Sequence, residues 1–244
     1  MGLPADMGLC LNFSSMQYRN AAMEGKRGNM FVFLDFEASS LSKRSYPIEV
    51  GWVFEDGRSD AFLIRPAPPW DDWDEASEAI HRISRAELHV SGADHDFVAR
   101  TMIERLAGHD LLASAPSWDG KWLSTLLRAC GLPRHSLRLR STDEGLRDVA
   151  RSILAERLDG DRLEEAVASL VALTARHDRS DPPAHRALAD ARDEHRRWQA
   201  VRRAALELLN TQTGSAEPAL QPVGLAMALP WGTQSAMTAR LRPV

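Results

Sequence analysis

The stretch that decides the fold is Phe31-Val32-Phe33-Leu34-Asp35-Phe36-Glu37, an apolar run of strand length that carries two acidic residues. Burying an ionised carboxylate costs several kcal/mol unless a partner compensates the charge. Hard divalent cations such as Mg²⁺ and Mn²⁺ prefer oxygen ligands and supply that compensation. The stretch therefore predicts a buried strand that carries part of a divalent-metal site. A structural salt bridge is the alternative, and the apolar character of the rest of the strand argues against it.

The two acids of this strand are expected on one face. Side chains alternate along a strand, so Asp35 and Glu37 point to the same side as Phe31 and Phe33. Their Cα atoms are expected about 6.6 Å apart, at ~3.3 Å per residue. From that separation the carboxylates can converge on two metal ions about 3.5–4 Å apart. Such a pair serves phosphoryl transfer, because one ion activates a water molecule and the other stabilises the leaving oxygen.

The composition is that of a globular protein. The chain has 244 residues, of which 44% are hydrophobic and 26% charged, and this predicts one sizeable domain. The formal net charge of −4 excludes a broadly basic nucleic-acid coat but allows a local basic groove. The two cysteines, Cys10 and Cys130, form no disulfide framework, so a reducing, cytoplasmic location is predicted. Neither a membrane span nor a secretory signal is visible.

Three regions are expected along the chain: a poorly ordered extension over 1–28, a folded domain over 29–210 and a flexible tail over 211–244. Prolines and glycines interrupt the tail, which is a candidate docking segment for a protein partner. The main strands expected in the domain are 30–37, 48–54, 60–65, 111–115 and 137–139, and the main helices are 94–107, 117–130, 141–154, 161–177 and 182–210. This order predicts an α/β layered fold with a mixed sheet.

Three further residues carry candidate chemistry. Asp119 follows the second apolar run, and His185 and Asp190 lie at the start of the last predicted helix. Five residues turn an ideal helix through about 500°, so two fully helical residues at this spacing would lie roughly 140° apart. Pro182 and Pro183 resolve the conflict if His185 lies in an irregular helix start and Asp190 lies one turn inside. An imidazole there suits a general base that takes a proton from water near neutral pH.

These five residues resemble the motifs of the DEDDh family of 3′-to-5′ exonucleases, whose relatives include polymerase proofreading subunits, ribonuclease T and oligoribonuclease. The family's Asp-x-Glu motif matches 35–37, its second aspartate matches Asp119, and its His-x-x-x-x-Asp motif matches 185–190. The resemblance covers roughly residues 30–205. One departure is the segment Ser114-Ala115-Pro116, which stands where many members have a His-Asn pair.

The resemblance implies a ribonuclease-H-like fold, with a mixed central sheet flanked by helices. It implies hydrolysis of single-stranded DNA or RNA from the 3′ end to nucleoside 5′-monophosphates. Four acids would hold two Mg²⁺ or Mn²⁺ ions, namely Asp35, Glu37, Asp119 and Asp190. His185 would be the general base, and Ala38 and Leu41, in the segment after the first motif, would contact the terminal nucleotide.

Two other functions stay open at this stage. One is a catalytically weak nucleic-acid-binding or regulatory module that kept the fold but lost turnover. A binding module needs no two-metal site, so a complete acidic set argues against it. The other is a phosphodiesterase that acts on very short oligonucleotides or cyclic nucleotides. The choice between DNA and RNA rests on contacts to the 2′-hydroxyl, which no residue here reveals.

Several aromatic and basic residues have two interpretations. Trp118 and Trp122 are four residues apart on one predicted helix, where core packing is favoured over base stacking. The Arg-rich segment 192–203 is either a solvated helix face or a patch that follows phosphates. His81 is interpreted as structural. A second candidate basic edge consists of Arg134, Arg138 and Arg140.

Overall fold

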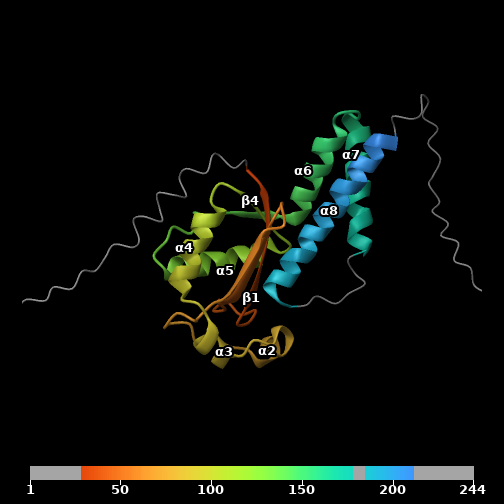
Figure 1. Ribbon diagram of the computed structural model, residues 1–244. Coiled ribbons are helices and arrows are strands. Elements are labelled where there is room, and N and C mark those ends of the chain that lie inside the picture. Colours follow the sequence, from red (N-terminus) through yellow and green to blue (C-terminus); the bar gives the residue numbers. More distant parts are fainter. Residues whose placement is uncertain (1–28, 178–184, 212–244) are drawn as a thin grey trace, which may run out of the picture.

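The computed structural model describes residues 29–177 and 185–211, and it has a sheet with helices packed on both faces (Figure 1). The sheet has five strands in the order β3-β2-β1-β4-β5. The strand that carries the two acids, β1, is the central one and is flanked on both sides. The predicted α/β class with a mixed sheet is confirmed. The predicted extension 1–28 and all but the first residue of the predicted tail lie outside the described residues.

The sheet is mixed because its two halves are connected differently. The first three strands form an antiparallel meander. On the other side of β1, β4 runs parallel to β1, and β5 runs parallel to β4. A parallel neighbour needs a crossover connection, and helices supply it on both occasions. The strands are β1 (Phe31–Ala38), β2 (Pro47–Phe54), β3 (Ser59–Leu63), β4 (Asp110–Ala113) and β5 (Leu139–Ser141).

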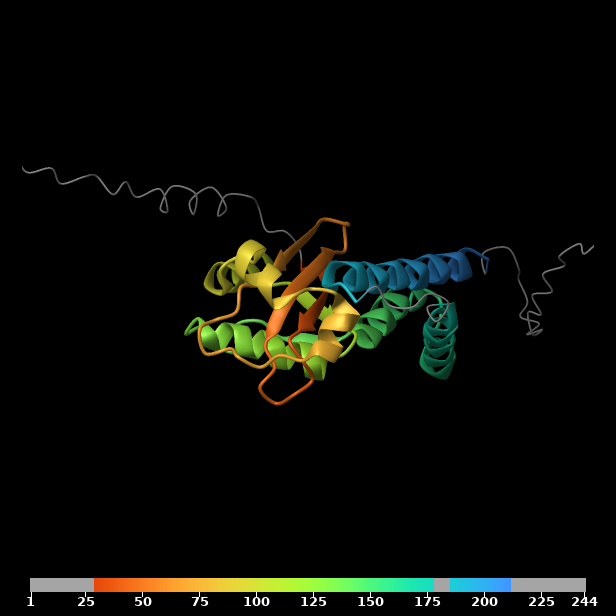
Figure 2. The ribbon, with the colours of Figure 1, turned by 90° about the horizontal axis from the view of Figure 1, so that it is seen from below.

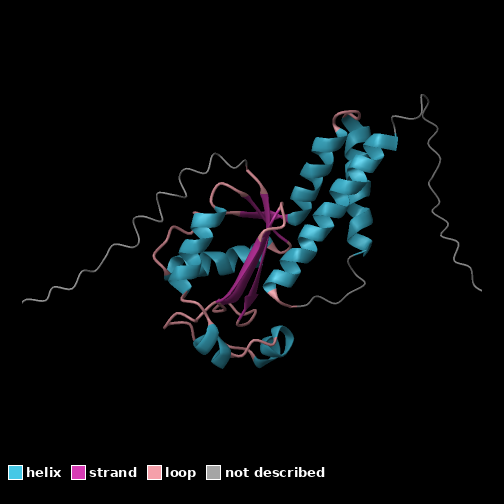
Figure 3. Cartoon of the chain, in the orientation of Figure 1, coloured by secondary structure: helices cyan, strands magenta, loops and turns pink. Residues whose placement is uncertain are grey.

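Two groups of helices enclose the sheet as separate layers, as Figure 3 shows. One layer contains α4 and α5, and the other contains α6, α7 and α8, whose far ends pack together beyond the sheet in Figures 1 and 2. Two short helices, α2 and α3, lie between β3 and α4 in the chain. The helices are α2 (Glu75–His81), α3 (Arg85–Ser91), α4 (His95–Leu106), α5 (Pro116–Ala129), α6 (Thr142–Leu154), α7 (Gly160–His177) and α8 (Ala187–Thr211).

The alternation along β1 divides its side chains between two cores. Val32, Leu34 and Phe36 are buried against the α4–α5 layer. Phe33 is fully buried against the α6–α8 layer, where Trp198 of α8 packs 6.0 Å from it between ring centroids. Asp35 shares the face of Phe33, as does Glu37, so both acids point toward α8 rather than α5.

The elements agree with the sequence-based expectations to within a few residues, with one exception. The last helix begins at Ala187, five residues later than predicted, and residues 178–184 before it lie outside the described part of the chain. Among the helices of the described residues, none is long and apolar enough to cross a membrane.

A glycine lets α8 approach the sheet closely. Gly51 of β2 is the cross-strand partner of Asp35. A Cβ added at Gly51 would lie 2.4 Å from the backbone nitrogen of Leu188, in the first turn of α8. Any side chain here would push the helix start away from the sheet, because backbone atoms cannot move aside as a flexible side chain can.

We therefore expect Gly51→Ala to lower the free energy of unfolding by about 1–3 kcal/mol, the usual cost of overpacking. Gly120→Ala is the matched control, because Gly120 lies within α5 with nothing near its added Cβ. That change should raise stability by roughly 0.5–1 kcal/mol through helix propensity. Denaturant unfolding followed by circular dichroism measures both. Equal midpoints for Gly51→Ala and the wild-type protein would contradict the close approach.

Candidate functional site

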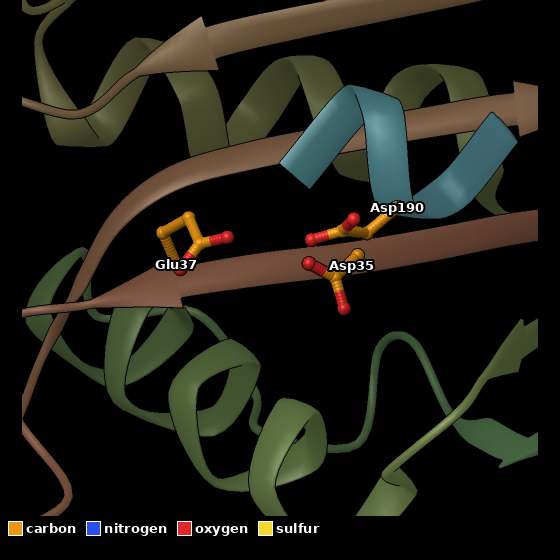
Figure 4. A group of neighbouring side chains, drawn as sticks. All are labelled: Asp35, Glu37 and Asp190. Carbon is orange, nitrogen blue, oxygen red and sulfur yellow. The ribbon is translucent and has the colours of Figure 1, made fainter. Parts of the chain in front are cut away.

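Three carboxylates meet where the first turn of α8 crosses β1. Asp35 and Glu37 project from β1, and Asp190 is the fourth residue of α8 (Figure 4). Each offers one oxygen to a group of atoms that all lie within 4.8 Å of one another. All three residues are half-buried. A group of hard oxygen donors at this spacing could hold a divalent cation.

Asp119 approaches the same place from the other helix layer. It is the fourth residue of α5, and only 2% of it is exposed. Its Oδ2 atom is buried without a hydrogen-bond partner among the described residues. Asp119 lies outside the group of three. Its charge nevertheless raises the pKa of Asp35 more than the charge of any other acid does.

The electrostatics of the site disfavour four ionised acids. Burial, followed by the charges of Asp119, Glu37 and Asp190, holds the pKa of Asp35 well above its usual range. Burial raises the pKa of Glu37 to about 8, with Asp190 and Glu49 adding to the effect and Arg186 opposing it. Burial likewise raises the pKa of Asp119 to about 7, against backbone amide groups that lower it. Burial and mutual repulsion therefore outweigh the Arg186 charge that acts on Glu37.

The residues present fit a divalent metal. The donors are carboxylate oxygens, the choice for Mg²⁺ or Mn²⁺, and the orphaned Oδ2 of Asp119 has capacity for one more bond. Within 29–177 and 185–211, neither Asp35 nor Glu37 forms a salt bridge, which argues against the structural ion pair considered as an alternative.

His185 lies two residues before α8, at the irregular helix start that the spacing argument requires. Its φ of 49° places it in the left-handed region, which few residues other than glycine adopt. Burial lowers the pKa of the nearby His81, and the charge of His185 lowers it further. His81 is 3% exposed, and its Nδ1 accepts a hydrogen bond from the Ile83 amide, in keeping with a structural role. His185 itself lies outside the carboxylate group.

Glu49 is a residue of the site that the sequence analysis did not identify. It lies on β2 directly opposite Glu37 and is 4% exposed. Its carboxylate accepts hydrogen bonds from the Arg186 guanidinium, at 2.7 and 3.0 Å, and from the Ala187 amide at 3.0 Å. The sequence gives one indication of its role, because Glu49 is the single acid in the apolar run of β2. Its partner is 137 residues away along the chain, so the pairing could not be read from the sequence.

The segment after β1 is held in a defined shape. Ala38 is buried at the end of β1, whereas Leu41 is 68% exposed. The Asp72 carboxylate accepts hydrogen bonds from the hydroxyl groups of Ser39, Ser40 and Ser42. The Lys121 ammonium of α5 donates to the Ser42 carbonyl and to the Ser45 hydroxyl at 2.8 Å. Leu41 is therefore an exposed apolar side chain on a segment tied to α5.

The two tryptophans of α5 differ in their surroundings. Trp122 is 7% exposed, belongs to the core, and donates from its indole nitrogen to the Ser45 hydroxyl at 3.0 Å. Trp118 is 40% exposed, and its ring lies 5.7 Å from that of Trp122. The core interpretation holds for Trp122. Trp118, next to Asp119 in the chain, is partly exposed, and the Lys121 ammonium lies over its ring, 5.1 Å from the centroid.

Two of the five arginines in the Arg-rich segment 192–203 of α8 form ion pairs. Arg197 bonds Asp143 of α6 at 2.7 Å and also pairs with Glu194, and its side chain is 14% exposed. Arg196 pairs with Asp193. At Arg196 and Arg197, these contacts favour an ion-paired helix face over a patch that follows phosphates.

The second basic edge divides in the same way. Arg140 is bound by Asp148 at 2.6 Å and by Asp110 at 3.4 Å. Arg134 and Arg138 form no salt bridge with any described residue, and with His135 they line a groove of about 390 Å³ beside α5. The same groove is lined by Gly120, which follows Asp119 in the chain. An unpaired basic surface therefore lies next to the helix that carries Asp119.

Comparison with known proteins gives structural neighbours only. No family model matches the chain, and no curated protein matches it. Escherichia coli exonuclease I matches in its zinc ion-bound complex with single-stranded DNA, at TM-score 0.53 and 15% identity over 76% of this chain and 43% of that one. Its complex with a dT13 oligonucleotide matches at TM-score 0.52 and 16% identity over 76% and 43%. Exonuclease I from Methylocaldum szegediense matches at TM-score 0.53 and 16% identity over 75% and 42%.

These neighbours establish the fold. The chain spans less than half the length of the exonuclease I chains that it matches. The mixed five-stranded sheet between helical layers is the ribonuclease-H-like fold of exonuclease I, and the predicted fold class is thereby confirmed. At 15–17% identity the likeness carries no further than the fold.

The raised carboxyl pKa values predict how the stability of the metal-free protein depends on pH. Between the unfolded pKa of Glu37, near 4.5, and its folded pKa, about 8, the folded state holds more protons than the unfolded state. The free energy of unfolding should therefore fall as pH rises from 6.5 to 8. This range lies above the ordinary pKa of His81, whose lowered pKa would give a slope of the opposite sign at lower pH. Urea unfolding in EDTA measures this slope.

Glu37→Gln is the control, because it removes one titrating group and should flatten the slope. Adding Mn²⁺ at pH 8 should restore stability to the wild-type protein, because a cation compensates the ionised acids. A slope of zero or of opposite sign would show that the acids titrate normally.

Proposed function

We propose that this protein is a metal-dependent 3′-to-5′ exonuclease that hydrolyses single-stranded nucleic acid to nucleoside 5′-monophosphates. The observation that carries the proposal is the convergence of three carboxylates within 4.8 Å, beside the buried Asp119, in an exonuclease I-like fold. Clustered acids whose pKa values are raised by burial and by one another suit a reaction in which divalent cations and a phosphodiester meet.

Asp35, Glu37, Asp119 and Asp190 would hold two Mg²⁺ or Mn²⁺ ions. When bound, such ions activate the attacking water and stabilise the leaving 3′-oxygen. Asp35 and Glu37 come from a central strand with cores on both faces, so the donors are held rigidly. Asp190 and Asp119 come from two different helix layers, so the site forms only when both layers pack on β1.

His185 is proposed as the general base. It lies two residues before α8 with a left-handed φ of 49°, so its backbone does not follow the helix that holds Asp190. An imidazole takes up a proton near neutral pH, which is what removal of a proton from the attacking water requires.

The surface around α5 supplies groups for the substrate. Ala38 and the exposed Leu41 would contact the 3′-terminal nucleotide, and the exposed face of Trp118 could take a neighbouring base. Solved neighbours include exonuclease I with dT13 and with dA16 oligonucleotides, so single-stranded DNA is the first substrate to test. RNA is the second, because the 2′-hydroxyl contacts decide between the two.

The decisive experiment incubates the full chain with 5′-labelled single-stranded DNA and RNA, in Mg²⁺, Mn²⁺ or EDTA. We expect a metal-dependent ladder that shortens from the 3′ end. His185→Ala should lower the rate about 10²–10⁴-fold, the usual contribution of a general base. Asp190→Asn should lower it at least as far, and Asp96→Asn in the first turn of α4 is the unaffected control.

Other outcomes identify the alternatives. Binding of the oligonucleotide without any cleavage would favour a nucleic-acid-binding or regulatory module. Turnover of only very short oligonucleotides would favour the phosphodiesterase. Cleavage that persists in EDTA, or that survives in Asp190→Asn, would contradict the metal-dependent mechanism.

The groove beside α5 predicts how longer strands bind. Arg134→Glu combined with Arg138→Glu should raise KM for a long oligonucleotide and reduce the slope of log affinity against log salt by roughly 1.4, about 0.7 for each phosphate contact. Arg157→Glu with Arg162→Glu, at the turn between α6 and α7, makes the same charge change elsewhere. If the two double variants have equal effects, the change in binding comes from net charge alone, and the groove is not a specific binding surface.

A further inference from the structure

Glu49 occupies the place in β2 from which the start of α8 can be controlled. Residues directly opposite in an antiparallel pair share one face. Glu49 lies opposite Glu37, and Gly51 lies opposite Asp35. The two β2 residues beside the acids therefore both meet α8: Gly51 by leaving room for the Leu188 backbone, and Glu49 through its carboxylate.

Glu49 acts as a cap for this helix start, where the described residues before it, His185 and Arg186, form no side-chain bond to the first amide groups of α8. The residue before α8 is Arg186, whose side chain carries no acceptor for the first amide groups of the helix. Glu49 supplies the acceptor from the sheet and binds the Ala187 amide at 3.0 Å. A negative charge at this end of a helix is also favoured by the helix dipole.

Arg186 links this anchor to Asp190. Its guanidinium bonds both carboxylate oxygens of Glu49, at 2.7 and 3.0 Å. Its backbone carbonyl accepts from the Asp190 amide at 3.0 Å, which closes the first turn. Arg186 therefore bonds to the sheet with its side chain and to the turn that carries Asp190 with its backbone. A shift of Arg186 would move the Asp190 carboxylate relative to Asp35.

Both oxygens of Glu49 accept these bonds, and Glu49 lies outside the group of carboxylates that converge on one another. We propose that Glu49 is a positioning residue, whose bonds to Arg186 and Ala187 set the Asp190 carboxylate against Asp35 and Glu37 and thereby set the affinity of the site for a divalent cation. The inference rests on the metal site of the proposed function and adds two residues outside its ligand set.

The test is a calorimetric titration of the metal-free full chain with Mn²⁺, without nucleic acid. Glu49→Ala and Arg186→Ala should each weaken Mn²⁺ binding about 10–100-fold, the usual effect of losing a partner that orients a metal ligand. Glu49→Gln keeps an acceptor for Ala187 and should recover part of the affinity. Arg197→Ala is the matched control, because it also removes an ion pair between α8 and another element, farther along the helix.

Arg197→Ala should lower the melting temperature and leave Mn²⁺ affinity unchanged. If Glu49→Ala and Arg186→Ala behave in the same way, Glu49 merely braces the fold and the inference is wrong. Circular dichroism shows whether each variant is folded. Should the alanine variants fail to fold, Arg186→Lys keeps the charge but loses the two-point bond, and it should still weaken Mn²⁺ binding.

The two proposals fail in different ways. Wild-type protein that binds Mn²⁺, with weaker binding in Glu49→Ala but no cleavage of any oligonucleotide, would contradict the nuclease and support the positioning role. Cleavage that is normal in Glu49→Ala, with normal Mn²⁺ affinity, would contradict the positioning role alone. Wild-type protein that does not bind Mn²⁺ would overturn both.

Discussion

Repulsion among buried carboxylates is the constraint on which the rest of this structure depends. Asp35, Glu37 and Asp190 lie within 4.8 Å of one another, and the buried Asp119 adds its charge to theirs. Without a cation, such a cluster favours separation of α8 and α5 from β1. The apolar layers on both faces of the sheet oppose that separation. The fold thus holds together groups that would repel one another when ionised, which is what a cation site requires.

The central strand combines these two tasks through its alternation. Val32, Leu34 and Phe36 pack into one core, and their burial anchors the strand. The residues on the opposite face of β1 are Phe33, which packs into the second core, and Asp35 and Glu37, which lie at the site. A one-residue slip in register would exchange the faces and place the acids in the α4–α5 core, so the same packing that stabilises the sheet also places the donors.

The parts of this arrangement that the sequence predicts are those with a local signal. The alternation and the Asp-x-Glu pair predict the central strand and its shared face, and the five-residue spacing predicts that His185 lies outside the helix that holds Asp190. The Glu49–Arg186 pair has no such signal, because it joins residues 137 apart through a register and a helix packing that only the fold determines. For the same reason Arg197 could be read as part of a nucleic-acid patch, although α6 neutralises it.

The two helices that complete the site differ in what surrounds them. The start of α8 is enclosed by β2, with Gly51 and Glu49 fixing its backbone, so this side has little freedom to adapt to a ligand. The start of α5 borders exposed Leu41, exposed Trp118 and the groove lined by Arg138, which offer apolar, aromatic and cationic contacts. Precise chemistry needs rigid donors, and recognition of a flexible strand needs accessible surface. Three of the four carboxylates therefore lie on the side where the start of α8 is fixed, whereas Asp119 lies on the helix that also borders the exposed groups.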